Sequence, residues 1–378
     1  MRRSFFLAVA VFLCFFLGAC DAKDTDNLFE TTQGQTPSVV NPSGSEEKMT
    51  GPSAEGSAPT VGDQAAMEEG YSYGNMQKNV PSGDFMQYED DIVFLSYSNR
   101  RFRLCTYDMK TGEVSLFFKD ATNQGGASVS GNLESYDGKL YVLNPASQAM
   151  EVKSDTLDPI IDGGLYSFWH SQGDLYVKTK DSSLLVYEND GGEPRTVLEE
   201  FTGIWSVVFG QYLYANVEEN IVRVDLEANE PQEEVLVKNA GGVIDGNHIY
   251  YVDYESWHLY RCDMDGSNPV LIVEKPVLLA SMNFENDYFY FRLYTGMELD
   301  EGEDCYDIYR FPKADPTQIE KIATLSAPAY QIYTVPGYDK IFVKTRGPVN
   351  ESGSGEEGPI YVMGLDGSDA RALELPDF

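Results

Sequence analysis

A short pattern of strand-forming residues recurs along most of the chain, and it constrains the fold more than any other feature. In each copy a turn residue precedes three or four apolar and aromatic residues, as in Gly138-Lys-Leu-Tyr-Val142 and Gly173-Asp-Leu-Tyr-Val177. The apolar runs of the seven copies begin 35 to 52 residues apart, at Ile92, Leu140, Leu175, Leu213, Ile249, Phe289 and Ile341. Self-similarity at a period of this length indicates a repeat architecture.

Each copy also contains further strand-like runs. A second run, such as Ile221-Val-Arg-Val224 or Leu259-Tyr-Arg-Cys262, is followed by a polar turn and another run, and one more run precedes the core. Four short antiparallel strands per unit are typical of a β-propeller blade, which buries both its faces only when blades stack in a ring. We therefore predict an all-β propeller of four-stranded antiparallel blades. Seven blades are favoured, and six or eight are alternatives because the third strand of the second copy is weak.

One copy resembles a known group of propellers. The segment from Ile249 to Asn268 reads Ile-Tyr-Tyr-Val-Asp-Tyr-Glu-Ser-Trp-His-Leu-Tyr-Arg-Cys-Asp-Met-Asp-Gly-Ser-Asn. It resembles a repeat of bacterial propellers of the DUF5050 type, which are similar to TolB-type and YWTD-type propellers. The resemblance is strongest in this copy and weaker over about 300 residues. It implies the propeller fold and brings no catalytic residues with it, and the Tyr-Trp-Thr-Asp motif itself is absent.

The first twenty residues are typical of a secretory signal peptide. Arg2 and Arg3 precede an apolar run that is too short to span a membrane as a helix. The run ends in Leu17-Gly-Ala-Cys20, which resembles a bacterial lipobox, and the resemblance implies acylation of the Cys20 thiol. An ordinary cleaved signal with an incidental cysteine is the alternative. We predict a lipid-anchored protein on the outer side of the cytoplasmic membrane, in the bacterial cell envelope.

Residues 21–83 differ in composition from the rest of the chain. They are rich in Ser, Gly, Pro, Thr, Gln and acids, with few apolar residues and no period, as in Asn41-Pro-Ser-Gly-Ser-Glu-Glu. Such a segment buries too little apolar surface to offset its ordering entropy. We predict a disordered acidic tether with a reach on the order of 40 Å, and a propeller domain over residues 84–378.

The charge and the cysteines limit the partners. The formal net charge is −34, so this chain is not expected to bind nucleic acid. Beyond Cys14 in the signal and Cys20, an odd number of cysteines is left, namely Cys105, Cys262 and Cys305. A disulfide framework is therefore not expected, although a bridge between Cys262 and Cys305 is an alternative. We expect a monomer that contacts the membrane only through its lipid.

The variable lengths fall in the connections between the second and third strands of each unit, the B–C connections. The two longer ones are predicted as loops from Thr295 to Asp307 and from Arg346 to Pro359. Variable loops on one face of a rigid scaffold are where binding usually occurs. The candidate ligand-binding residues lie in or beside these connections or, for Trp205, near the channel mouth, and they are Tyr97, Arg100, Trp205, Tyr254, Trp257 and Tyr294. The alternative role for any one of the aromatic residues is packing between blades.

One long B–C connection carries a group of acids. Its candidate metal ligands are Asp300, Glu301, Glu303 and Asp304. Clustered carboxylates can hold Ca²⁺, and a solvated charged loop is the favoured alternative. No other cofactor is expected. The turn from Asp263 to Gly266 lacks the ligand ladder of a calcium loop, so turn chemistry explains it.

Sequence motifs of catalysis were sought and are absent. The chain contains no Gly-x-Ser-x-Gly, no His-Glu-x-x-His and no glycine-rich nucleotide loop. The favoured hypothesis is a non-catalytic module that binds an envelope protein or a glycan. A metal-dependent enzyme with its site at the channel mouth (a lactonase, lyase or glycosidase) is one alternative, and a structural envelope component is another, because the fold supports all three.

Overall fold

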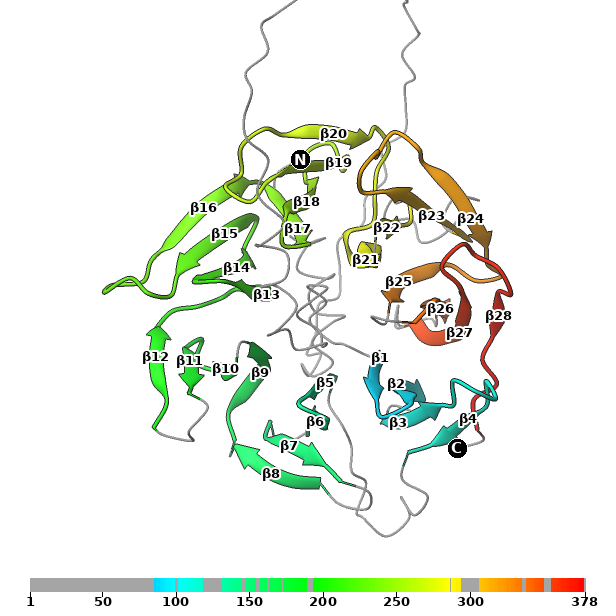
Figure 1. Cartoon of the computed structure of the whole chain (residues 1–378), viewed down its shortest axis with the longest axis horizontal. Coiled ribbons are helices and arrows are strands. Elements are labelled where there is room, and N and C mark those ends of the chain that lie inside the picture. The colour runs from blue at the N-terminus through cyan, green and yellow to red at the C-terminus, as the bar shows by residue number, and fades with distance from the viewer. Residues whose placement is uncertain are drawn as a thin grey trace, which may run out of the picture. The chain divides into compact units, whose positions relative to one another are not determined.

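The protein is a seven-bladed β-propeller, as a computed structural model shows (Figure 1). The structure describes residues 85–98, 101–117, 131–144, 147–153, 157–161, 163–171, 173–188, 193–285, 287–293, 306–334, 338–349 and 355–376. The predictions for residues 1–83, including the signal, Cys20 and the tether, lie outside this part. Within it, no helix is long and apolar enough to cross a membrane.

Each blade is one antiparallel sheet of four strands that follow one another in sequence, so the predicted blade count of seven is confirmed. The first three blades are β1 (Phe85–Tyr88), β2 (Asp91–Ser98), β3 (Arg101–Tyr107), β4 (Val114–Leu116); β5 (Gly131–Tyr136), β6 (Lys139–Leu143), β7 (Ala149–Val152), β8 (Leu157–Ile161); and β9 (Leu165–Ser171), β10 (Asp174–Thr179), β11 (Leu184–Tyr187), β12 (Arg195–Leu198). The weak third strand of the second unit is β7.

The other four blades repeat the same order, with the first strand innermost and the fourth outermost (Figure 1). They are β13 (Ile204–Phe209), β14 (Tyr212–Val217), β15 (Asn220–Asp225), β16 (Glu233–Lys238); β17 (Ala240–Ile244), β18 (His248–Asp253), β19 (Leu259–Asp263), β20 (Val270–Val273); β21 (Asn283–Glu285), β22 (Tyr288–Phe291), β23 (Asp307–Pro312), β24 (Glu320–Thr324); and β25 (Ala329–Thr334), β26 (Lys340–Val349), β27 (Gly355–Gly364), β28 (Arg371–Ala372). The short 3₁₀ helix η1 (Leu279–Ser281) precedes β21.

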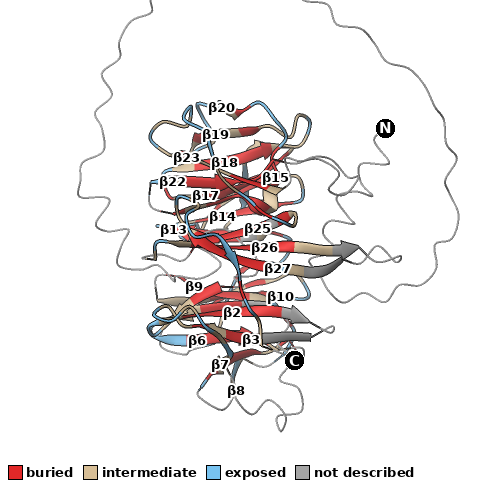
Figure 2. Cartoon of the chain, turned by 90° about the vertical axis from the view of Figure 1, so that its right-hand side faces the viewer, coloured by how far each residue is buried: buried red, intermediate tan, exposed pale blue. Residues whose placement is uncertain are grey.

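The hydrophobic core is distributed around the ring, between neighbouring blades. In β2, Phe94 packs into a cluster shared with the seventh blade, while the adjacent Val93 and Leu95 pack into a cluster shared with the second blade. Successive side chains of a strand point to opposite faces, and both faces of a blade are covered. This explains why the second strand of each blade is apolar without alternation. In the side view of Figure 2, these strands are coloured mostly as buried.

Candidate functional site

Long B–C hairpins distinguish two adjacent blades from the others. In the seventh blade, β26 and β27 have ten residues each and pair as far as Val349 and Gly355. Their central partners, Ile341 and Met363, are 22 residues apart in sequence. The sequence predicted a loop from residue 346 to residue 359, but the structure extends the strands into most of it.

The sequence separation between paired residues of the second and third strands differs among the seven blades. The equivalent partners Phe289 and Phe311 of the sixth blade are also 22 residues apart. In the fourth blade, by contrast, Leu213 and Val224 are 11 residues apart, and the remaining blades span 12 to 15. The two longest B–C connections therefore belong to adjacent blades, six and seven.

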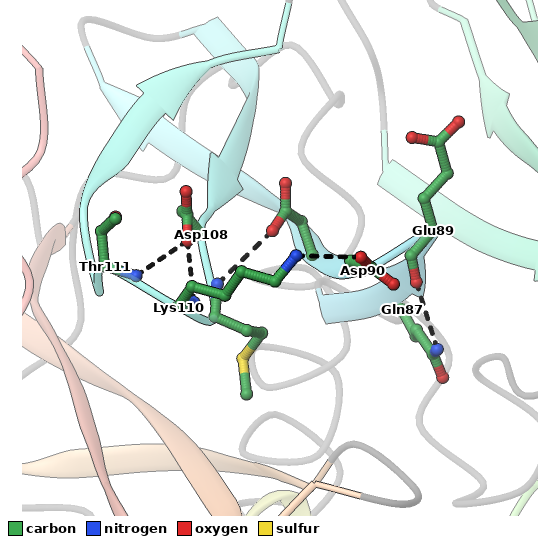
Figure 3. Close-up of polar contacts among 8 residues, drawn as sticks. Gln87, Glu89, Asp90, Asp108, Lys110 and Thr111 are labelled. Carbon is green, nitrogen blue, oxygen red and sulfur yellow. Dashed lines mark hydrogen bonds and ion pairs between the residues drawn. The ribbon is translucent and has the colours of Figure 1, made fainter.

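The opposite face is built from short turns with internal hydrogen bonds. In the turn between β3 and β4, Asp108 Oδ1 accepts hydrogen bonds from the backbone N–H groups of Lys110 and Thr111, each at 2.8 Å (Figure 3). Lys110 Nζ then reaches Asp90 Oδ2 in the neighbouring A–B turn at 3.1 Å. Backbone donors hold the Asp108 pKa below its usual range. The turn on this face is thus compact and held by hydrogen bonds within it.

The turn that resembles a calcium loop follows the same chemistry. Asp265 Oδ1 accepts a hydrogen bond from Ser267 N at 2.9 Å, and Asp263 Oδ2 accepts one from Asn268 Nδ2 at 2.7 Å. Among the residues that the structure describes, no three His, Cys, Asp or Glu side chains are grouped so as to hold a metal ion. The candidate ligands Asp300, Glu301, Glu303 and Asp304 lie outside those residues, so calcium binding stays a prediction.

Two of the predicted ligand-binding aromatics are described, and both pack against other parts of the propeller. The ring of Tyr254 lies 5.8 Å from that of Trp257 between β18 and β19, and both side chains are only partly exposed. The Tyr254 hydroxyl lies so close to Gly241 of β17 that a Cβ there would come within 2.3 Å of it. Burial raises the pKa of Tyr254 to about 12.

Trp257 has a backbone constraint of its own. Its φ is +61°, a left-handed conformation that a bulky residue adopts rarely. Its N–H donates to Asp253 O at 2.7 Å, and its carbonyl accepts from Val277 N at 2.9 Å. These bonds tie the B–C turn of the fifth blade to the strand entry of the sixth, which fits the alternative role of packing between blades.

The other four predicted residues are placed only in part. Tyr97 lies in β2 opposite Phe102, and Trp205 lies in β13, but their side chains are outside the described structure. Arg100 and Tyr294 fall between described segments. Their roles stay predictions.

Buried polar side chains of one blade reach the backbone of the innermost strand of the next blade. Asn216 Nδ2 donates to Gly242 O at 3.0 Å, and Asn216 Oδ1 accepts from Gly242 N at 2.7 Å. Asn283 Nδ2 donates to Ile332 O at 2.7 Å. An innermost strand has one edge without a partner strand, and buried backbone groups need partners. These side chains supply them across the gap between blades.

The bridge between blades two and three is the charged member of this set, and sequence reasoning missed it. Glu134 of β5 accepts two hydrogen bonds from His170 of β9: Oε1 from the backbone N–H at 2.6 Å and Oε2 from ring Nδ1 at 2.9 Å. Both residues are buried. Glu134 pairs across its blade with Tyr141, at the position that Val207 and Val243 occupy in later blades. An acid at an apolar repeat position was the sequence pattern that could have revealed it.

A second buried charge lies between blades three and four. Lys178 Nζ donates to the carbonyl oxygens of Gly203 at 2.8 Å and Thr202 at 3.1 Å, and it lies 4.6 Å from the centroid of the Tyr166 ring. Burial lowers the pKa of Lys178 to about 8. Lys178 thus supplies hydrogen-bond donors for two backbone carbonyl groups just before β13.

Comparisons with known proteins do not assign this chain to a family. No family model matches the chain, and no curated protein does. Among solved structures, the chain is similar to the tricorn protease (TM-score 0.37, 11% identity, 75% of this chain and 31% of that chain). It is also similar to a chain of a nidogen/laminin complex (0.38, 14%, 65% and 92%) and to YCF48 bound to a D1 peptide (0.42, 11%, 62% and 78%). The chain thus spans less than a third of the tricorn protease. The seven-bladed assignment rests on the strand pairing itself.

Proposed function

We propose that this protein is a lipid-anchored propeller of the bacterial envelope that binds a protein or a glycan through its B–C face, without catalysing a reaction. The observation that carries the proposal is the pair of adjacent long B–C connections in blades six and seven. A rigid scaffold with extended segments on one face and short satisfied turns on the other is suited to recognition through the extended face.

The anchor follows from the sequence. The order of basic start, apolar run and Leu17-Gly-Ala-Cys20 supports acylation at Cys20, and two or three acyl chains anchor a protein stably. The polar segment after Cys20 would let the binding face sample the space above the membrane. Strong negative charge favours a cationic surface on the partner.

The test compares three forms of the full lipidated chain in detergent, each immobilised and exposed to solubilised envelope. The first is unchanged. The second replaces residues 346–358 with Asn-Gly, a two-residue turn like Glu218-Glu219 of the fourth blade. The third, a matched control, replaces Ala228, Asn229 and Glu230 in an exposed turn of the opposite face with glycine and serine.

We expect the unchanged chain and the control to retain the same partner. The form with the shortened hairpin should retain at least about tenfold less of it. Equal retention by all three forms would show that the hairpin face is not the binding surface. A Cys20→Ala form should no longer fractionate with membranes, and Cys14→Ala should still do so. Membrane association of the Cys20→Ala form would remove the anchor from the proposal.

Catalysis is the second candidate function, and the buried Glu134–His170 pair favours it. A carboxylate that orients an imidazole is a common arrangement of general bases. Loss of a turnover activity in His170→Ala with retained partner binding would support this function over the first.

A further inference from the structure

The carboxylate of Glu134 does more than satisfy a backbone group. Asn283 occupies the same position in the sixth blade, because it pairs with Tyr290 as Glu134 pairs with Tyr141. Asn283 bridges to the next blade with a neutral amide. A charge is therefore not needed for the bridge. What the second oxygen of Glu134 adds is an acceptor for Nδ1 of His170, at 2.9 Å.

This hydrogen bond selects the form of the imidazole. A neutral histidine whose Nδ1–H donates to a carboxylate has an unprotonated Nε2 with an available lone pair. The His170 ring contacts the rings of Tyr136, stacked with 4.4 Å between centroids, and Tyr141, tilted with 4.8 Å between centroids. Nε2 makes no hydrogen bond to a described residue, and 10% of the side chain is exposed. A largely buried acceptor is thus left for a ligand.

The surrounding charges are mostly negative. Asp137 and Asp174 lie close enough to act on the Tyr136 hydroxyl, and Glu151 and Glu134 act on that of Tyr141. The cation beside them, Lys139, lies 3.8 Å from Glu151. Tyr136 ends β5 directly before an A–B turn, so the pair lies toward the face of short turns, away from the long hairpins.

We propose that the Nε2 edge of His170 is a binding site for a primary ammonium group. An ammonium supplies the N–H donor that Nε2 lacks, and its charge is favoured among the carboxylates. A neutral hydroxyl offers the donor without the charge. This site is separate from the B–C face and does not depend on its function.

One substitution reverses the chemistry of Nε2 while it keeps the bridge. In Glu134→Gln, the amide oxygen still accepts the His170 backbone N–H, but the amide NH₂ now donates to Nδ1. The neutral ring then carries its proton on Nε2, which becomes a donor and repels an ammonium. Glu151→Gln is the matched control, because it removes a nearby carboxylate that does not contact the imidazole.

The measurement is a long-range ¹H–¹⁵N NMR spectrum of the full chain in detergent, above the ordinary imidazole pKa. The chain has three histidines, so His170→Asn assigns the signal. The probes are ethanolammonium and, as a neutral analogue of the same shape, ethylene glycol. Ammonium groups occur on small amines and on lysine side chains, so Nα-acetyl-lysine amide distinguishes a peptide source from a free amine.

We expect an unprotonated Nε2 that shifts saturably with ethanolammonium and not with ethylene glycol. Glu134→Gln should weaken this response at least about tenfold and Glu151→Gln by less than about threefold. Saturation by the lysine amide as well would assign the ligand to peptides. A protonated Nε2 in the unchanged protein, equal shifts with the glycol, or no shift with either ammonium would each overturn the proposal.

Discussion

Buried charged and polar side chains in this propeller form hydrogen bonds to the backbone of a neighbouring blade. Lys178 Nζ donates hydrogen bonds to the carbonyl oxygens of Gly203 and Thr202, and the Asn216 amide pairs with both the N–H and the C=O of Gly242. No described carboxylate forms an ion pair with Lys178, so its charge is stabilised by the two carbonyl dipoles and the Tyr166 ring. Burial of the ammonium still costs stability, and this cost depends on pH.

Lys178→Met should remove one pH dependence of stability. The Lys178 pKa is about 8 in the folded protein and 10.5 ordinarily, so between these values the unfolded chain holds a proton that the folded chain lacks. Unfolding free energy then rises with pH, on the order of 1–2 kcal/mol between pH 7.5 and 9.5. Urea unfolding at several pH values should show this rise in the unchanged protein and its absence in Lys178→Met.

The range stops at pH 9.5 because buried tyrosines, such as Tyr176 with a pKa of about 12, reverse the trend at higher pH. Lys180→Met, two residues along, controls for the loss of a positive charge. If the unchanged protein and Lys178→Met rise in parallel, Lys178 is not the group that titrates.

At the scale of elements, the turns between the third and fourth strands of blades five and seven pack against the preceding blade. Gly367, in the turn between β27 and β28, has φ +82° and lies against the backbone of Ile322 in β24. Gly266 lies in the same way against Leu236 of β16. The recurring Asp-Gly turns therefore have a packing role that their local conformation alone does not require.

Gly367→Ala should be more destabilising than an alanine at a glycine with only a local role. An added Cβ would lie 2.0 Å from Ile322 O, whereas at Gly138, with φ +69°, it would meet nothing within 4 Å. Both changes incur a left-handed backbone cost of about 1–2 kcal/mol, and Gly367→Ala adds about 1–3 kcal/mol of overpacking. Equilibrium unfolding of both variants checks the difference, and equal losses would rule out the packing role.

At the scale of the whole molecule, the closure of the ring depends on side chains. Among the described strands, β1 to β4 form blade one and β25 to β28 form blade seven, and none of these strands pairs with the other blade. An aromatic cluster joins the two blades: the ring centroid of Phe85 lies 4.8 Å from that of Phe342 and 4.9 Å from that of Tyr333. Arg371 Nη2 also donates to Gly112 O of the first blade at 3.0 Å.

Phe342→Ala should open this junction selectively. Phe342 is fully buried, and its truncation should cost about 3–5 kcal/mol. Hydrogen exchange should accelerate first in β1 to β4 and in β25 to β28. Phe311→Ala, which removes an equally buried ring between blades five and six, should accelerate exchange there instead. A uniform increase in both variants would mean that the ring opens as one cooperative unit.

The sequence alone determined the architecture. Seven apolar cores at a near-regular period specify seven four-stranded blades, because each strand must bury both faces and only a ring of blades allows this. It also located the connections that vary in length, since turn residues mark where each strand ends. The partly buried positions of Tyr254 and Trp257, in contrast, could not be read from their place beside a loop.

Only the tertiary structure decided which residues meet across blades. Glu134 and His170 are 36 residues apart, and their contact depends on how far blade three is rotated against blade two. The same holds for Lys178 with Gly203 and for Phe85 with Phe342. A repeat fixes the strands within a blade through local pairing, whereas the partner of an inner-edge side chain is set by the packing of the next blade, which no local pattern encodes.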